Sequence, residues 1–376
     1  MLTSLGFSCD GFDYGIAAEA KEFDGINQYI RITDIDDDSS SYTSRNSVSP
    51  SFLDENCVCI ENDILFARTG ASTGKTYLYN RNDGKLYFAG FLIRANVKPI
   101  FDPYFVFTMT KTSRYANWIK IMSARSGQPG INAQEYKTFS FYHPSLKTQN
   151  KISKFIKNID KRIQTQSKII EDLKLLKFRL IDSLIGENIP NCIFENLYNF
   201  ASEGGTPSTS KMQYYENGTI PFVKIDDLKE KYLQENRDYI TEDGLSNSSA
   251  WLIPTNSIIY SNGATIGKLS INTYPIATKQ GILGIIPSKL VIPEYMYYFM
   301  QSKYFRPAVH KITVKGTMDC AYLKDLSKIK CYIPSIKEQE KDIDILNCLD
   351  EKIKIEYILI KKYKEQKKFL LSNMFI

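Results

Sequence analysis

The strongest constraint on this chain is that its sequence contains the same unit twice. A shift of 193 positions aligns residues 29–35 with residues 222–228, and residues 63–75 with residues 256–268. Further along the chain the shift falls to 190, as small deletions would cause, and Gln149 then meets Gln339. A long repeat that occurs only twice is typical of a pseudo-dimer and not of a solenoid. We therefore interpret residues 1–185 and 186–376 as two versions of one unit.

Each unit begins with a globular part of mixed secondary structure. Residues 64–67 and 257–260 are short apolar runs that end at glycine-rich loops, which predicts strands. Residues 104–111 and 294–302 are predicted helices. The expected fold class is mixed α/β (α+β), with two tandem domains in a pseudo-two-fold arrangement, separated by two long antiparallel coiled-coil helices.

The second part of each unit is predicted to be a long helix. Apolar residues recur at alternating steps of four and three from Ile152 onwards, which is the spacing of a coiled-coil stripe. Gln166 and Lys177 interrupt the stripe in the first helix, and Glu356 and Lys367 interrupt it at the equivalent positions of the second. The expected limits are 1–145 and 187–334 for the globular domains, and 146–186 and 335–376 for the helices.

The matching interruptions predict a register for an antiparallel helix pair. Matched polar layers fix the register of paired helices, whereas an unmatched buried charge is costly. One register matches both interruptions at once, with these facing pairs: Lys177 with Glu356, Gln166 with Lys367, and Ile170 with Tyr363. The alternative is two amphipathic helices that each pack on their own globular part.

One loop resembles a nucleotide-binding motif, but its spacing argues against that function. Three residues separate Gly70 from Gly74, whereas the phosphate-binding loop has four between its glycines. The repeat copy has Leu269 after its lysine, where the motif needs a metal-binding Ser or Thr. We interpret the Gly-Ala-x-x-Gly-Lys segment as a tight turn that presents Arg68, Lys75 and Lys268.

Other catalytic motifs are also incomplete. Residues 102–105 resemble the D-P-P-Y motif of amino-methyltransferases but lack its second proline, so we interpret them as the start of a helix. The Pro-Asp dipeptide of a common nuclease motif does not occur, and His143 and His310 do not occupy equivalent positions of the repeat. We therefore expect no catalytic centre, no metal site and no cofactor bound by this chain.

Composition and cysteine spacing place the chain among folded proteins of a reducing compartment. Hydrophobic residues make up 43% of the 376 residues, and the net charge of +6 is compatible with nucleic acid without being specific for it. No C-x-x-C occurs among the seven cysteines, so we expect neither a disulfide framework nor a zinc site, and we interpret Cys57 and Cys59 as strand residues. We expect no secretory signal, no membrane segment and a cytoplasmic location.

The remaining polar loop residues favour nucleic-acid binding. Arg, Asn and Gln pair with base edges, while Lys more often contacts phosphate. The two loops share the Gly-Ala-x-x-Gly-Lys residues but differ in the residues before and between them. This combination is expected of two domains that recognise different sequences. The expected DNA-contacting residues are Arg31, Arg68, Ser72, Thr73, Lys75, Arg94, Arg125, Lys224, Asn262, Thr265, Lys268, Lys279, Gln280 and Lys315. For any one of them alone, the alternative is a solvated surface residue.

Four features occur together: the repeated order of domain and helix, residues 28–35, the two loop segments 63–75 and 256–268, and residues 202–207. In this combination the chain resembles, over essentially its whole length, the specificity subunit of type I restriction-modification systems. The resemblance implies that each globular domain recognises one half of a split double-stranded DNA sequence. It also implies that the helices form an antiparallel spacer, here about 55 Å long at ~1.5 Å per residue.

The same resemblance implies partners. A specificity subunit of this family has no catalytic activity. It joins two modification subunits, which methylate adenine with S-adenosylmethionine, and restriction subunits, which use ATP and Mg to translocate and cut DNA. Two alternatives remain: a methyltransferase with fused recognition domains, for which the repeats leave no catalytic domain, and a coiled-coil scaffold protein, which leaves the difference between the two loops unexplained.

Overall fold

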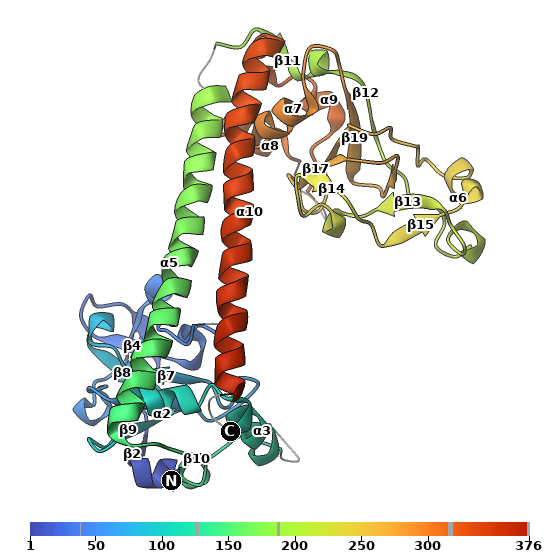
Figure 1. Cartoon of the computed structure of the whole chain (residues 1–376). Helices are drawn as coiled ribbons and strands as arrows, with labels where there is room; N and C mark the ends of the chain where they lie inside the picture. The colour runs from blue at the N-terminus through green and yellow to red at the C-terminus, as the bar shows by residue number, and fades with distance from the viewer. Residues whose placement is uncertain (38, 125–127, 186–188, 315–318, 374–376) are drawn as a thin grey trace. The chain divides into compact units, whose positions relative to one another are not determined.

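The computed structural model divides the chain into two compact units. It describes residues 1–37, 39–124, 128–185, 189–314 and 319–373. Unit 1 consists of Met1–Lys168 and Ile358–Ile376, and unit 2 consists of Ile169–Tyr357. Each unit therefore contains one globular part and a segment of each long helix, α5 (Leu146–Ile185) and α10 (Ile336–Asn373) (Figure 1).

The globular part of unit 1 is organised around a four-stranded antiparallel sheet. The strand order of this sheet is β2–β9–β6–β7; β4 pairs with β8 in parallel, and β1–β10 and β3–β5 are antiparallel pairs. The strands are β1 (Leu2–Ser4), β2 (Cys9–Tyr14), β3 (Ala20–Glu22), β4 (Gln28–Ile30), β5 (Val48–Pro50), β6 (Asp63–Ala67), β7 (Thr76–Leu78), β8 (Leu86–Phe88), β9 (Leu92–Val97) and β10 (Ser140–Tyr142).

The strand β6 is central to the core of unit 1, and all five of its residues are buried. Because successive strand residues point to opposite faces, Ile64 and Phe66 join one hydrophobic cluster and Leu65 and Ala67 join another. Both faces of the sheet are therefore covered, which holds the loop that follows β6 on a rigid base.

Helices of unit 1 begin at side-chain caps. Asp102, Thr112 and Asn132 each accept a hydrogen bond from a backbone N–H in the first turn of the next helix. The helices of the globular part are α1 (Leu5–Ser8), α2 (Pro103–Met109), α3 (Ser113–Met122) and α4 (Ala133–Lys137), with 3-10 turns η1 (Ile32–Asp34), η2 (Ser44–Asn46), η3 (Glu55–Cys57) and η4 (Arg81–Asp83).

Unit 2 repeats the main part of this topology, with β15 added antiparallel to β13. The strand order β12–β19–β16–β17 corresponds to β2–β9–β6–β7, and β14 extends that sheet. The parallel pair β13–β18 corresponds to β4–β8, and the antiparallel pair β11–β20 corresponds to β1–β10. The strands are β11 (Cys192–Ile193), β12 (Tyr198–Glu203), β13 (Ile220–Val223), β14 (Tyr232–Leu233), β15 (Asp238–Ile240), β16 (Ile258–Ser261), β17 (Leu269–Asn272), β18 (Ala277–Thr278), β19 (Ile282–Pro287) and β20 (Lys330–Cys331).

The helices of unit 2 pack aromatic side chains against its main sheet. Tyr295, Tyr298 and Phe299 of α7 are buried in the same cluster as Ile258 and Tyr260 of β16. The shorter helices are α6 (Glu242–Ser246), α7 (Pro293–Phe299), α8 (Phe305–Ile312) and α9 (Leu323–Leu326), with 3-10 turns η5 (Phe194–Leu197), η6 (Met212–Tyr214) and η7 (Ile225–Asp227).

These elements confirm the predicted strands and helices. The run at 64–67 lies in β6, residues 258–260 of the second run lie in β16, and the predicted helices correspond to α2 and α7. The prediction for Cys57 and Cys59 was wrong: Cys57 ends η3 and Cys59 follows it, because the apolar pattern of a short buried segment does not distinguish a strand from a 3-10 turn. Among the described residues, no helix is both long and apolar enough to cross a membrane.

The start of each long helix is fixed to its globular part by the same buried glutamine. Gln149 of α5 accepts a hydrogen bond from the Asp102 N–H at 3.1 Å, and Gln339 of α10 accepts one from the Ile292 N–H at 2.9 Å. Each amide also donates to the carbonyl of the proline five residues earlier. Residues related by the 190-residue shift therefore make equivalent contacts, in addition to being of the same type.

The polar partners on the two long helices differ from those predicted. Within unit 2, Lys177 forms an ion pair with Asp350, and within unit 1, Lys367 forms one with Asp160. Glu356 instead pairs with Lys352 of its own helix at 2.6 Å. The two lysines thus form ion pairs with aspartates that the predicted register did not include, and the residues that face Gln166 and Glu356 across the helix pair stay predictions.

The reason for this difference is the position of the two aspartates. Asp160 and Asp350 each follow an apolar residue of the stripe and lie beside it, so a pattern restricted to the stripe omits them. A lysine side chain is long enough to reach such a flanking carboxylate. The two ion pairs are equivalent at the 190-residue shift, so each helix contributes one lysine and one aspartate. The pairing of Ile170 with Tyr363 stays a prediction.

Candidate functional site

The loop between β6 and β7 is a tight turn closed by backbone hydrogen bonds. The Gly74 N–H donates to the Ala67 carbonyl at 2.9 Å, and the Ala67 N–H donates to the Lys75 carbonyl at 2.8 Å. Gly74 has φ +90°, and a Cβ there would lie 2.8 Å from the Ile119 side chain. Only glycine satisfies both conditions.

The loop between β16 and β17 has the same frame in unit 2. The Gly267 N–H donates to the Ser261 carbonyl at 3.0 Å, and the Ser261 N–H donates to the Lys268 carbonyl at 2.8 Å. Gly267 has φ +100°, which matches its counterpart in unit 1. The frame predicted from the repeat is therefore a real structural repeat.

The residue after Lys75 does not face the loop as a nucleotide site would require. Thr76 is fully buried, and its hydroxyl bonds the Thr110 hydroxyl at 2.7 Å and accepts from the Lys111 ammonium at 2.6 Å. The described residues also contain no cluster of three His, Cys, Asp or Glu side chains suited to a metal ion. The loop geometry thus favours a binding surface of another kind.

Both loop lysines pair with a strongly exposed aspartate. Lys75 lies 2.7 Å from Asp37, whose side chain is 91% exposed, and Lys268 lies 3.7 Å from Asp226, whose side chain is 78% exposed. The Lys268 side chain is itself 39% exposed, so its ion pair contributes little to stability and a phosphate group could replace Asp226 at small cost. The Lys75 side chain is only 13% exposed, so a phosphate would have to approach from the side that Asp37 occupies.

Arg68 differs from these lysines because it has no carboxylate partner among the described residues. Its guanidinium lies 4.9 Å from the centre of the Tyr14 ring, and its Nε is buried without a hydrogen-bond acceptor in the described part of the chain. In unit 2 the equivalent place belongs to Asn262, because the Asn262 N–H donates to the Gly281 carbonyl at 3.0 Å as the Arg68 N–H donates to the Phe91 carbonyl at 3.1 Å. The two loops thus share their backbone hydrogen bonds and differ in the side chain that follows the first strand of each loop.

Three further loop residues have small side chains near the same turns. Ser72 and Thr73 are partly buried, and the Thr73 hydroxyl donates to the Gly70 carbonyl at 2.7 Å, which occupies its proton. Thr265 is exposed in the unit 2 loop. Of the three, Thr265 is the most available to a ligand.

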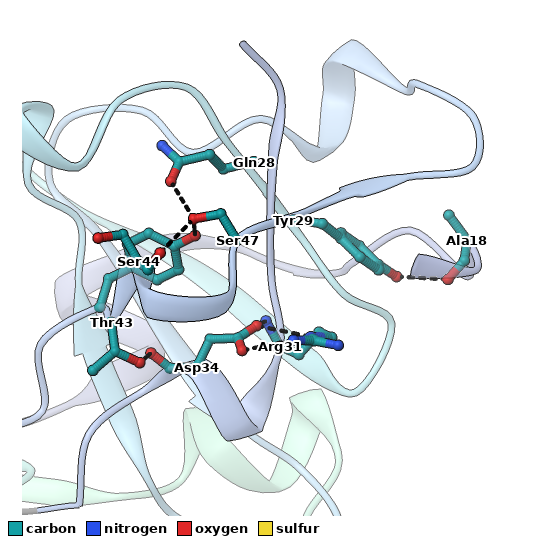
Figure 2. A network of polar contacts seen from close by, with 9 residues as sticks. Ala18, Gln28, Tyr29, Arg31, Asp34, Thr43, Ser44 and Ser47 are labelled. Carbon is teal, nitrogen blue, oxygen red and sulfur yellow. Dashed lines mark hydrogen bonds and ion pairs between the residues drawn. The ribbon is translucent and has the colours of Figure 1, made fainter. Parts of the chain in front are cut away.

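The segment after β4 is held by an arginine that caps a 3-10 turn. Arg31 makes two hydrogen bonds of 2.9 Å to the Asp34 carboxylate, which also accepts from the Arg31 N–H (Figure 2). Figure 2 also shows Tyr29 donating to Ala18, and Ser47 tying Gln28 to this segment. Arg31 therefore orders the segment, with its guanidinium already engaged.

Unit 2 builds the same turn with a different cation. The Asp227 carboxylate accepts from the Lys224 N–H at 2.9 Å, but its guanidinium partner is Arg237, at 2.9 Å. Lys224 instead pairs with Asp238 at 2.9 Å. The sequence analysis missed Arg237, although the substitution of Lys224 for the first arginine was a signal that another cation was needed.

Two expected DNA-contacting residues have structural surroundings instead. Arg94 of β9 donates to Asp13 at 2.8 Å and to the Val58 carbonyl at 3.3 Å, with its side chain 18% exposed. Asn262 is 1% exposed and donates to the Ala321 carbonyl. Arg94 thus lies in a strand and not in a loop, and Asn262 is buried by the packing of its loop, while contact of either residue with DNA stays a prediction. Tyr14, which supports Arg68, was missed.

The other expected residues have varied positions. Lys279 and Gln280 are exposed between β18 and β19, and their N–H groups are tied to Val223 and Thr206. Arg125 and Lys315 lie outside the described residues. The candidate surface therefore centres on Arg68 and Lys75 in unit 1, and on Lys268, Lys279 and Gln280 in unit 2.

Behind the unit 1 loop lies a lysine with altered acidity. The Lys111 ammonium donates to the Ser40 hydroxyl at 2.7 Å and to both oxygens of Thr76. Burial lowers the pKa of Lys111 to about 7. Nearby charges also act: Lys367 and Lys75 lower this pKa, and Asp160 raises it. Lys111 thus connects the recognition loop to the residues that join the long helices.

Comparison with known proteins finds one family in both units. The family model described as "Type I restriction modification DNA specificity domain" matches residues 15–175 and, a second time, residues 193–364. Each match includes one globular part and most of the helix that follows it.

Individual relatives have related descriptions. The type I restriction enzyme EcoR124I/EcoR124II specificity subunit of Escherichia coli is 30% identical over 151 residues, which are 39% of this chain and 37% of that protein. The alignment thus spans little more than a third of the relative's length. The putative type I restriction enzyme MjaX specificity subunit of Methanocaldococcus jannaschii is 24% identical over 329 residues, which are 81% of this chain and 74% of that protein.

Solved structures have the same fold. A chain from a study of complex assembly and conformational transition of the type I R-M system aligns with a TM-score of 0.62 and 15% identity, over 99% of this chain and 96% of that chain. The type I restriction-modification S subunit from M. genitalium aligns with a TM-score of 0.58 and 16% identity, over 100% of this chain and 96% of that chain.

Proposed function

Because the chain belongs to the type I restriction-modification DNA specificity domain family, we propose that it is the non-catalytic subunit that selects the DNA target of such a system. In this proposal the globular domains 1–145 and 187–334 each bind one half of a bipartite duplex sequence. The two long helices set the spacing between the half-sites and dock the modification subunits.

The observation that carries the proposal is a repeated loop frame with different edges. The turns at Gly74 and Gly267 have matching backbone hydrogen bonds, whereas Arg68 of one loop is replaced by Asn262 in the other. A scaffold function does not explain why the backbone of the two loops is the same while the side chain next to the turn differs. Two domains that recognise different sequences through one docking geometry require this combination.

Arg68 is the residue of unit 1 best suited to a base edge. The Tyr14 ring lies beside its guanidinium, and no carboxylate among the described residues occupies the donors. A guanidinium fork matches the O6 and N7 acceptors of guanine in the major groove. Unit 2 has no arginine at this position, so we expect Lys279 and Gln280 to supply its polar contacts.

The loop lysines are suited to phosphate. In the free protein Lys75 and Lys268 are paired with exposed aspartates. On binding, a phosphate oxygen would replace Asp37 or Asp226, and the affinity would then fall with rising salt concentration because counterions are released from DNA. Such contacts position the protein on the duplex without selecting a sequence.

The catalytic steps belong, in this proposal, to partner proteins. The relatives described above are named as specificity subunits of type I restriction enzymes. We infer that two modification subunits supply S-adenosylmethionine-dependent adenine methylation, and that restriction subunits supply ATP- and Mg-dependent cleavage. DNA is then the ligand of this chain itself, and the cytoplasm is its place of action.

Methylome sequencing of the host with and without the gene tests the proposal. We expect one bipartite N6-methyladenine motif to disappear on deletion and to return on complementation. An unchanged methylome, in cells that express the neighbouring modification subunit, would contradict the proposal and favour a scaffold function. Loss of methylation at a continuous, undivided motif would contradict the assignment of one half-site to each unit.

A further inference from the structure

The two strands at the ends of unit 2's globular part place a pair of cysteines opposite each other. β11 follows α5 along the chain, and β20 precedes α10. Cys192 of β11 is directly paired with Cys331 of β20, and their Sγ atoms lie 3.5 Å apart. Their separation of 139 positions in the sequence concealed this pair from any analysis of spacing.

Hydrogen bonds from the adjacent residue keep the two thiols in this position. The Asn191 N–H donates to the Cys331 carbonyl at 3.0 Å, and the Asn191 amide exchanges two hydrogen bonds with the Ile333 backbone, at 2.9 and 3.0 Å. Residues facing each other on antiparallel strands have Cα atoms about 4.5–5.5 Å apart, which lies within the range of about 4.4–6.8 Å found in disulfides. Only side-chain rotation is then needed to bring the sulfurs to bonding distance.

The two thiols differ in their access to solvent. Cys192 is partly exposed, whereas Cys331 is fully buried. Burial, reinforced by the neighbouring Cys192 sulfur, raises the pKa of the Cys331 thiol. A reagent in solution therefore reaches Cys192 first, and Cys331 reacts only with a group already attached to its neighbour.

We propose that Cys192 and Cys331 form a redox-active dithiol, a modification site for low-molecular-weight disulfides. The Cys192 thiolate attacks one sulfur of the small disulfide, and the first small thiol leaves. Cys331 then loses its proton and attacks the Cys192 Sγ, and the second small thiol leaves. The two protein thiols are oxidised to one disulfide, and the small disulfide is reduced to two thiols.

The bond would close the chain around one recognition domain. It links β11 to β20, so the ends of the segment that contains the β16–β17 loop could no longer separate. The corresponding ladder of unit 1 pairs Leu2 with Tyr142 and Thr3 with Phe141, and it contains no thiol. Oxidation would thus stabilise unit 2 alone, and this proposal does not depend on what the loop binds.

Peptide mapping of the full-length protein after equilibration with glutathione and glutathione disulfide tests the site. We expect a disulfide-linked peptide pair containing Cys192 and Cys331, absent from Cys192→Ser and Cys331→Ser and retained in Cys348→Ser. Cys348 is exposed on α10 and is the matched control for reactivity without a nearby partner. A lasting glutathione adduct on Cys192 with Cys331 unmodified, or a link between other cysteines at the same redox ratio, would overturn the proposal.

Thermal unfolding supplies a second readout. The oxidised wild-type protein should unfold at a temperature several degrees higher than the reduced protein, because a disulfide restricts the unfolded chain. Cys192→Ser, treated with the same oxidant, should show no such rise. Equal midpoints for oxidised and reduced wild type would overturn the stabilising effect.

Discussion

Arg68 directly follows the strand β6 and lies beside Tyr14, and its Nε is buried without a partner among the described residues. Because a guanidinium that contacts guanine supplies about 1–3 kcal/mol of base discrimination, Arg68→Ala should weaken binding of the target duplex roughly 5- to 150-fold. Binding of an unrelated duplex should weaken much less. Anisotropy titrations at fixed salt measure both affinities.

A matched control for Arg68 is Lys120→Ala, which removes an exposed cation from α3. This variant should lower both affinities slightly and equally. Equal losses for target and unrelated DNA in Arg68→Ala would contradict a role in base recognition and would leave only a phosphate contact.

Lys111 predicts a pH dependence of stability. Its pKa is lowered from 10.5 to about 7 on folding. Between these values the unfolded chain keeps a proton that the folded chain has released, so the free energy of unfolding should rise with pH, by at most about 1.4 kcal/mol per pH unit. Below pH 7 both states hold the proton, and the full cost of burying the cation remains.

Urea unfolding at pH 6, 7.5 and 9 measures this dependence. Lys111→Met should flatten the rise, because it removes the titrating group, whereas Lys120→Met should keep the wild-type rise. A Lys111→Met protein with an unchanged slope would show that other groups cause the dependence.

At the residue scale, the sequence predicted the loop glycines and lysines but not which cations were already engaged. Arg31, Arg68 and Arg94 look alike in sequence, yet Asp34 and Asp13 engage the first and third. Asn262 was predicted to contact DNA from its loop, but it is buried in the folded domain. The residues that pair with or bury these side chains can lie far away in the sequence, so the local sequence pattern does not predict them.

The long helices are held together by the two equivalent ion pairs. The Lys177 and Asp350 side chains are 16% and 29% exposed, and Asp350 also accepts a hydrogen bond from Tyr298 at 2.6 Å. A double-mutant cycle with Lys177→Met and Asp350→Asn should give a coupling energy of about 1–2 kcal/mol, between the values typical of exposed and buried pairs.

The pair of Lys328 and Asp325 is the control for this cycle, because its lysine is 74% exposed. Its coupling energy should be about 0–0.5 kcal/mol. If the two cycles gave the same value, the ion pair of the helices would have no special structural role.

At the scale of elements, the sequence predicted the helices well because each has a long apolar period. Among the described residues α5 spans Leu146–Ile185 and α10 spans Ile336–Asn373, and residues 186 and 374–376 of the predicted ranges 146–186 and 335–376 lie outside the described residues. The polar register was predicted less well, since the flanking Asp160 and Asp350 are outside the apolar stripe. The spacing of apolar residues identifies the buried face of a helix, whereas the length of a lysine side chain determines which carboxylate it pairs with.

At the scale of the whole molecule, the repeat was the most informative feature. It predicted two copies of one topology, and the sheets β2–β9–β6–β7 and β12–β19–β16–β17 confirm this. It did not predict the extension of the second sheet by β14, or the cysteines that face each other in β11 and β20. Both features belong to one copy only, so self-comparison of the sequence could not reveal them.

The central claim is that each globular domain recognises one half of the DNA target. The most direct test replaces residues 1–145 with a second copy of residues 187–334 and sequences the methylome of cells that express this chimera with the modification subunit. If the claim is right, the half-site assigned to unit 2 remains and a second copy of it replaces the other half. A motif in which the unit 2 half-site changes, or in which the original unit 1 half-site persists, would contradict the claim.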